Sequence, residues 1–355
     1  MSFISKEKSD KQDVVIIGHF GGHENILDGQ TIKTKILYQE LKNATEWNLI
    51  KVDTYYKKHN PIKLVKDTLK YLLTKRTVIV LLSGNGMRFY FPMLYFFSKV
   101  FHTRVFHDVI GGNLDMYVKK YPKFRKYLTS FQVNWVEAKS MQTKLEELGI
   151  DNCEVIPNFK RLKIVEVPEK EFQEPYRFCM FSRVMKEKGV ETAIEAVETI
   201  NGLAGKNVCE LDIYGRIDEG YGEQFERIMC NVTPAIQYKG VVPYDKSVEV
   251  IKDYYALLFP TFWRGEGFPG TVIDAFAAGL PVIATDWNCN TEIIENNIEG
   301  IIYPCEEVQD LTSAIRKLIH CKNIRIMREN CMKKALCYQP DRYIKKIVSL
   351  IENEK

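Results

Sequence analysis

The 355-residue chain lacks several patterns that would place it in well-known protein classes. Its nine cysteines are scattered and include no Cys-x-x-Cys pair, which argues against a disulfide scaffold and fits a reducing compartment. No Gly-x-Gly-x-x-Gly is present, so the fingerprint of a nicotinamide dehydrogenase is missing. Residues 1–11 have no apolar core and do not resemble a signal peptide. We therefore expect a cytoplasmic protein.

Metal-binding patterns are also scarce. His320, Cys321, Cys331 and Cys337 lie close together in the sequence, but on a predicted helical stretch and without the ligand spacing of a zinc finger. No Asp-x-Asp triplet occurs, so the sequence does not require a metal ion for phosphate chemistry. We expect no metal ion and no other cofactor.

Long apolar runs are missing as well. The most aromatic segment, residues 89–97, is too short to span a bilayer because Arg88 and Lys99 bound it. A buried helix is the ordinary interpretation. The alternative is a helix face that lies in an anionic membrane surface, which the basic and aromatic run 119–126 supports. Nucleic acid could bind the same pattern, but no recognised nucleic-acid module accompanies it, so we expect no nucleic-acid partner.

Length and charge indicate two unlike halves. A chain of 355 residues exceeds what one hydrophobic core usually supports, so two domains are expected. Residues 1–165 carry 27 Lys and Arg against 16 Asp and Glu, a formal charge of +11. The remainder carries 23 against 30, a formal charge of −7. The basic half favours an anionic surface or a diphosphate-bearing acceptor, with ordinary solvated lysines as the alternative.

Apolar strand runs alternate with helical patterns along both halves, which predicts an α/β fold with mostly parallel sheets. The first run, residues 14–17, leads into Gly21 and Gly22, which would let the backbone approach a ligand closely. A plain tight turn fits these glycines as well. The polar segment 171–175 is a plausible linker between the halves.

A basic loop follows the predicted strand 177–181. It places Arg183 and Lys188 between the carboxyl end of that strand and the start of a helix. A guanidinium, an ammonium and unpaired helix amides together suit a diphosphate. Two solvated loop bases are the alternative interpretation.

An acidic turn precedes a short helix between the apolar runs 255–259 and 282–284. Glu266 stands in the turn, Asp274 lies within one turn of the helix start, and between them come Gly267, Phe268, Pro269 and Gly270. The first amide groups of a helix have no internal partner and bind ligand oxygens. Because carboxylates accept hydrogen bonds from hydroxyls, the turn suits a polyol. Two solvated acids near a helix start are the alternative.

Glu-Gly-Phe-Pro, an acid eight positions after Glu266, and the following Ala-Gly-Leu-Pro-Val-Ile-Ala together resemble the retaining glycosyltransferases of family 4. The resemblance implies the GT-B architecture, in which two Rossmann-like domains face each other across a cleft and a C-terminal helix crosses back to the first domain. We expect an acceptor-binding domain over residues 1–170, a nucleotide-sugar-binding domain over 171–337 and the returning helix over 338–355.

The resemblance also implies roles for the singled-out residues. Glu266 would contact the donor hexose and Asp274 the ribose, although the family usually has Glu where this chain has Asp274. Arg183 and Lys188 would neutralise the departing diphosphate. The backbone from Gly267 to Gly270 would orient the sugar, and the glycines at positions 21 and 22 would lie near the donor phosphates.

His107 is a further candidate because it ends a predicted strand at the expected cleft. Most single histidines are surface or core residues. Members of family 4 often carry a histidine in the corresponding His-Asp segment, facing the reactive end of the sugar, so we expect His107 to assist catalysis.

The implied activity is retaining transfer of a hexose, without a metal ion, from a nucleotide sugar such as a UDP-sugar to a saccharide or lipid-linked saccharide. The setting would be bacterial capsule or exopolysaccharide synthesis, peripheral to the inner face of the cell membrane. Two alternatives stay open: a nucleotide-sugar epimerase of the same fold, and a non-catalytic membrane-bound assembly subunit.

Overall fold

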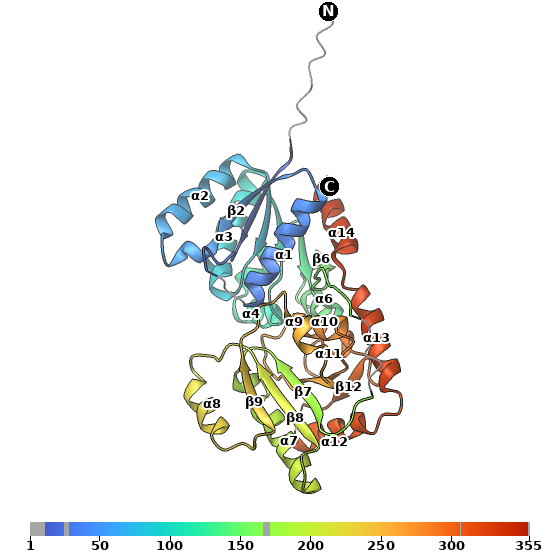
Figure 1. Cartoon of the computed structure of the whole chain (residues 1–355). Helices are drawn as coiled ribbons and strands as arrows, with labels where there is room; N and C mark the ends of the chain where they lie inside the picture. The colour runs from blue at the N-terminus through green and yellow to red at the C-terminus, as the bar shows by residue number, and fades with distance from the viewer. Residues whose placement is uncertain (1–10, 25–27, 166–170, 306, 354–355) are drawn as a thin grey trace, which may run out of the picture.

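The computed structural model describes residues 11–24, 28–165, 171–305 and 307–353. It has two parallel sheets, each of six strands, with the orders β2-β1-β3-β4-β5-β6 and β12-β11-β10-β7-β8-β9 (Figure 1). Helices cover both sheets, and the carboxyl ends of the two sets of strands face the junction between the domains. The predicted pair of Rossmann-like domains is confirmed.

The first sheet and its helices are built from residues 11–165. Its strands are β1 (Asp13–Gly18), β2 (Asn48–Asp53), β3 (Thr77–Leu81), β4 (Arg104–Asp108), β5 (Val133–Val136) and β6 (Cys153–Val155). Its helices are α1 (Gly29–Ala44), η1 (Thr54–Lys57), α2 (Pro61–Thr74), α3 (Gly84–Val100), α4 (Leu114–Lys120), α5 (Lys123–Leu128) and α6 (Lys139–Glu146).

The second sheet follows the same plan. Its strands are β7 (Tyr176–Phe181), β8 (Cys209–Tyr214), β9 (Ile236–Gly240), β10 (Ala256–Phe259), β11 (Val282–Thr285) and β12 (Gly300–Tyr303). Its helices are η2 (Lys186–Lys188), α7 (Val190–Ala204), α8 (Gly222–Met229), α9 (Ser247–Ile251), α10 (Gly270–Ala277), α11 (Asn290–Ile293), α12 (Val308–Ile319) and α13 (Ile324–Leu336), after which comes α14 (Pro340–Glu352).

Strand β1 shows how the sequence divides the core of the first domain. Successive side chains of a strand point to opposite faces of the sheet. Val14 and Ile16 belong to the cluster that holds the apolar sides of α1 and α14. Val15 and Ile17 belong to the cluster that holds α2 and α3. A continuous apolar run is therefore needed, because both faces of the sheet are covered.

Helix α14 crosses back from the second domain to the first (Figure 1). Ile344, Ile347 and Ile351 are spaced along one helix face, and all three are buried against the first sheet. Arg104 of β4 donates a hydrogen bond of 2.7 Å to the carbonyl of Ile351. The predicted returning helix is confirmed, and the expected domain boundary after residue 170 adjoins residues 166–170, which lie outside the described ranges.

Candidate active site

Lys188 and Glu266 form a buried ion pair at the carboxyl edge of the second sheet. Lys188 ends the turn η2 after β7, and Glu266 lies in the loop between β10 and α10. The Lys188 Nζ contacts the Glu266 Oε2, and the two side chains are only 10% and 8% exposed. Thr261 donates a hydrogen bond of 2.9 Å to the same carboxylate oxygen. Because a buried charge without a partner is strongly unfavourable, each group holds the other in place.

Aromatic rings line the ammonium of this pair. The Lys188 Nζ lies 5.6 Å from the ring centre of Phe259 and 5.0 Å from that of Trp263. Ring faces attract cations, most strongly where water is excluded. Trp263 and Thr261 were not predicted as site residues, because neither has a spacing that marks it in the sequence.

Arg183 does not join the pair. Its side chain is 47% exposed, and its Nη1 lies 3.7 Å from the Asp218 Oδ2. The sequence predicts that Arg183 and Lys188 converge, but in the structure Lys188 is committed to a carboxylate while Arg183 faces solvent. A half-exposed guanidinium at a helix approach is nevertheless suited to an incoming anion.

Asp274 lies near the start of α10 and is already engaged at both carboxylate oxygens. Lys160 places its Nζ 2.7 Å from Oδ1, and Ser247 donates a hydrogen bond of 2.5 Å to Oδ2. Burial raises the pKa of Asp274, and Lys160 opposes that shift. Lys160 belongs to the segment that leaves the first domain, so this pair joins the two domains. Nothing in the sequence marks Lys160 or Ser247 as partners of the acid.

The segment 265–268, called here the sugar loop after the role that the resemblance predicts for it, touches the first domain with its backbone. The Gly112 amide donates to the Gly265 carbonyl at 3.3 Å, and the Phe268 amide donates to the Glu137 Oε2 at 2.9 Å. A Cβ atom on Gly267 would lie 2.3 Å from that same carboxylate oxygen, so any side chain there would push Glu137 aside. The Phe268 amide, expected to help orient a sugar, is thus bound by Glu137 in this structure.

Pro269 and Gly270 form the start of α10. Pro269 is the residue that caps the helix, and Gly270 is its first helical residue. A proline has no amide hydrogen, so it offers a ligand no backbone donor. Of the predicted sugar-orienting backbone, the amides of Gly267 and Gly270 remain the candidates.

Gly21 and Gly22 make a tight turn after β1. Gly22 has a φ of 58°, and its amide donates to the Asp53 Oδ2 at 2.8 Å. A Cβ atom at Gly22 would lie 2.4 Å from the ring of Tyr55. The turn and its packing therefore account for this glycine, and its amide is held by the protein.

The prediction that His107 faces the cleft is wrong. The residue is fully buried, its Nδ1 lies 3.0 Å from the Asn134 Oδ1, and the rings of Phe91 and Phe131 pack around it. Burial lowers the pKa of His107 to about 4, so the imidazole is neutral. The alternation of β4 sends His107 toward α3 and leaves Asp108, its neighbour, to contact Lys33 of α1.

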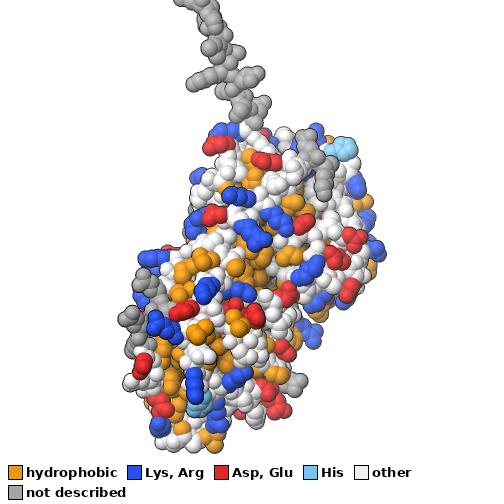
Figure 2. All heavy atoms as spheres, turned by 90° about the vertical axis from the view of Figure 1, so that its right-hand side faces the viewer, with side chains coloured by type: hydrophobic (Ala, Val, Ile, Leu, Met, Phe, Trp, Pro, Cys, Tyr) orange, Lys and Arg blue, Asp and Glu red, His pale blue; other side chains and the backbone are white. Residues whose placement is uncertain are grey.

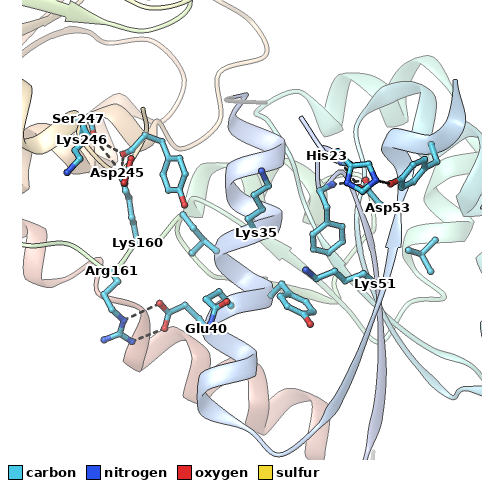
Figure 3. A pocket seen from close by; sticks show the side chains of 18 of the residues that line it. His23, Lys35, Glu40, Lys51, Asp53, Lys160, Arg161, Asp245, Lys246 and Ser247 are labelled. Atoms are coloured by element: carbon cyan, nitrogen blue, oxygen red, sulfur yellow. Dashed lines mark hydrogen bonds and ion pairs between the residues drawn. The ribbon is translucent and has the colours of Figure 1, made fainter. Parts of the chain in front are cut away.

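A cleft of about 1360 Å³ opens between the domains beside Lys160 and Ser247 (Figure 3). Its walls are α1, β2 and the η1–α2 turn on one side, the connecting segment 160–165, and residues 244–249 of the second domain. Gly22 is the one predicted site residue that lines it. Lys160 and Ser247, the partners of Asp274, also line it, so the cleft reaches the rim of that carboxylate but not the buried Lys188.

Two helices of the first domain expose apolar side chains. On α2 these are Ile62, Val65, Leu69 and Leu73, and on α3 they are Phe89, Phe96 and Val100. The Lys126 Nζ lies 4.8 Å from the ring centre of Tyr95, which places the predicted basic run beside α3. On the face formed by α13 and α14, by contrast, charges of both signs are interspersed (Figure 2). Within the described ranges, no helix is long and apolar enough to cross a membrane.

Two parallel-sheet domains joined by a returning helix, with an acidic loop and a lysine meeting at their junction, define a protein of the GT-B class. Residues 163–336 match the model of the family described as glycosyl transferases group 1.

Relatives and solved structures agree with this assignment. The amylovoran biosynthesis glycosyltransferase AmsK of Erwinia amylovora is 22% identical over 185 residues, which cover 50% of this chain and 44% of that protein. The UDP-Gal:alpha-D-GlcNAc-diphosphoundecaprenol alpha-1,3-galactosyltransferase of Escherichia coli is 26% identical over 87 residues, 24% of this chain and 22% of that protein. The chain thus spans less than half the length of these relatives.

The similarity of fold extends over nearly the whole chain. Sucrose-phosphate synthase from Thermosynechococcus elongatus superposes with a TM-score of 0.78 at 14% identity, covering 96% of this chain and 98% of that chain. An identity this low shows the shared GT-B fold alone.

Proposed function

We propose that this chain is a glycosyltransferase that moves a hexose from a nucleotide sugar, most simply a UDP-sugar, to a lipid-linked saccharide. The observation that carries the proposal is the buried pair of Lys188 and Glu266 at the edge of the sheet, directly before the start of α10. An acid that accepts hydroxyl hydrogen bonds and a cation that binds phosphate oxygens stand next to each other there. A nucleotide sugar carries both hydroxyl groups and phosphate oxygens.

Leaving-group stabilisation is the proposed source of most of the rate. The bond from the anomeric carbon to the diphosphate oxygen breaks, the acceptor hydroxyl oxygen bonds the same carbon, and negative charge grows on the diphosphate, which can take up the hydroxyl proton. Lys188 has three N–H donors, so it can bind a phosphate oxygen while it keeps Glu266. Arg183, half exposed in the same loop, supplies a second cation. Preorganised donors of this kind lower a barrier by several kcal/mol.

Further features of the proposal rest on the resemblance to family 4. The reaction would retain the anomeric configuration, and side chains would neutralise the diphosphate without a metal ion. Asp274 would contact the ribose through lone pairs that Lys160 and Ser247 leave open. The first domain would bind the acceptor, for which the cleft between the domains offers the space.

We also propose that the first domain lies on an anionic membrane surface on the cytoplasmic side. The exposed side chains of Phe89 and Phe96 are flanked by Lys99 and by the basic run that contacts α3 through Lys126. Apolar insertion combined with lysines is the usual basis of binding to anionic lipid. A lipid-linked acceptor, of the kind named for the E. coli relative, would be met at such a surface.

The test has two stages. A thermal-shift screen of UDP-glucose, UDP-galactose, UDP-N-acetylglucosamine and GDP-mannose identifies the donor, because a ligand that binds only the folded state raises the melting temperature. Turnover of that donor is then measured with and without undecaprenyl-diphosphate saccharides as acceptors. Acceptor-dependent release of the nucleoside diphosphate supports the proposal. Conversion of the donor without an acceptor would instead identify an epimerase, and no response to any sugar nucleotide would reject the proposal.

A further inference from the structure

Glu137 divides its two carboxylate oxygens between the domains. It is the first residue after β5 and is only 4% exposed. Its Oε1 accepts a hydrogen bond of 2.8 Å from Lys33 of α1, within the first domain. Its Oε2 accepts the hydrogen bond of 2.9 Å from the Phe268 amide, in the sugar loop of the second domain. One buried side chain thus connects the first domain directly to the loop that carries Glu266.

Lys33 fixes the position of this carboxylate. Its Nζ lies 2.7 Å from the Asp108 Oδ1 and donates a hydrogen bond of 3.0 Å to the Val109 carbonyl. Burial alone would lower the pKa of Lys33, but Asp108 and Glu137 together raise it, so the ammonium stays charged. Side chains held by several buried partners have little freedom to move. Glu137 is therefore a rigid acceptor and not a mobile surface acid.

The second domain holds the sugar loop from the opposite side. Asn288 donates a hydrogen bond of 3.1 Å to the Glu266 carbonyl, and the Cys289 thiol lies 3.2 Å from the Gly267 carbonyl. These contacts fix two loop carbonyls, whereas the Phe268 amide is fixed by the first domain alone. The loop therefore has its full set of partners only when the two domains are in contact.

We propose that Glu137 is a positioning residue that sets the sugar loop when the domains come together. When the domains separate, the Phe268 amide loses its acceptor, and the backbone next to Glu266 is free to turn. When they close, the amide is recaptured and Glu266 is returned to its place beside Lys188. The inference deepens the proposed function and rests on it, since the loop is taken to hold the donor hexose.

The chain offers a matched control for this contact. Glu292 of α11 also accepts backbone hydrogen bonds across the domain boundary, from the amides of Lys139 and Ser140 at 2.8 and 3.0 Å. It belongs to the second domain, and neither bond involves the sugar loop. If Glu137 merely helped to hold the domains together, Glu137→Gln and Glu292→Gln would have similar effects.

The experiment compares these variants in binding and turnover. Glu137→Gln keeps the size of the side chain but turns a donor toward either Lys33 or Phe268. We expect the affinity for UDP alone to stay within about twofold, while the affinity for the UDP-sugar and kcat fall about tenfold, as for one charge-assisted hydrogen bond. Glu292→Gln should leave the ratio of the two affinities unchanged. An equal loss for UDP and UDP-sugar, or the same pattern in Glu292→Gln, overturns the proposal.

A ligand-free measurement separates this inference from the function on which it rests. Hydrogen exchange in a peptide covering residues 262–272 should speed up in Glu137→Gln and not in Glu292→Gln. Gly267→Ala, whose Cβ would lie 2.3 Å from the Glu137 Oε2, should disturb the same contact from the other side and serves if the first variant folds poorly. If hydrogen exchange in this peptide is unchanged in both Glu137→Gln and Gly267→Ala, the positioning role is rejected. If exchange is faster in Glu137→Gln but the wild-type protein binds no sugar nucleotide, the contact is supported and the proposed function is rejected.

Discussion

Lys160 and Asp274 meet across the domain boundary, with 2.7 Å between the Lys160 Nζ and the Asp274 Oδ1. The lysine also donates a hydrogen bond of 2.9 Å to the Tyr244 carbonyl. Asp274 is one methylene shorter than the glutamate usual at this place in family 4, and its Oδ1 is paired with the Lys160 ammonium. The acid expected to serve the donor is therefore also part of the attachment between the domains.

The first prediction concerns that pair. Lys160→Met leaves the buried Asp274 carboxylate without its cation, which should lower the free energy of unfolding by about 3 kcal/mol, the scale for breaking a buried pair. Denaturant unfolding at neutral pH measures the change. Lys160→Arg keeps the charge and should lose much less. A loss of less than about 0.5 kcal/mol in the Met variant would show that water already screens the carboxylate.

A second prediction concerns Lys188. Replacing it with Met removes the cation next to the departing diphosphate, so kcat should fall about 10² to 10³-fold. The assay is initial-rate transfer with the donor found in the screen. Lys186→Met, in the same turn but exposed, is the control and should change kcat less than about threefold. Similar rates in the two variants would exclude Lys188 from the reaction.

A third prediction follows from the buried imidazole. The pKa of His107 is lowered from an ordinary 6.5 to about 4 by burial. Between these values the unfolded chain binds a proton that the folded chain does not, so stability falls as pH falls from about 6.5 toward 4. A pKa shift of this size changes the free energy of unfolding by up to about 3 kcal/mol.

His107→Asn should lose that part of the pH dependence while it keeps a group able to bond Asn134. The comparison is the difference in unfolding free energy between pH 7.5 and pH 5 for each protein. Asp108, whose pKa burial raises to about 6, acts in the opposite direction in both proteins and cancels. An equal difference in the two proteins would show that the pKa of His107 is not lowered in solution.

A fourth prediction addresses the membrane. Phe89→Ser combined with Phe96→Ser should reduce binding to phosphatidylglycerol vesicles at least about tenfold, because two exposed rings no longer insert. Sedimentation with the vesicles gives the bound fraction. Leu203→Ser removes an apolar side chain that is 70% exposed on α7 of the second domain, and it should leave binding unchanged. Undiminished binding of the double variant would place the lipid contact elsewhere.

Part of the site could be predicted because it depends on neighbours in the chain. The acidic turn, the start of α10 and the basic loop after β7 all lie at the carboxyl ends of strands, as expected. Local periodicity and turn residues decide where a strand stops and a helix starts. That Glu266 and Lys188 lie in the same region depends in addition on the pairing of β7 with β10, which the resemblance to family 4 implied and local patterns do not give.

Other contacts could not be predicted, since they join segments from different domains. Lys160 and Glu137 stand at unremarkable positions, and their partners in the second domain lie 114 and 131 residues further along the chain. His107 was misplaced for a related reason: the strand was identified correctly, but the pleat sends its side chain toward α3.

By itself the sequence determined two parallel α/β units and the positions of the acidic and basic loops, because period, turn chemistry and chain order are local properties. The returning helix was expected only from the resemblance to family 4. Only the tertiary structure decided which side chains in those loops face each other. That outcome depends on how two separately folded sheets are set against one another, and a change of one residue in strand phase would turn every side chain to the opposite face.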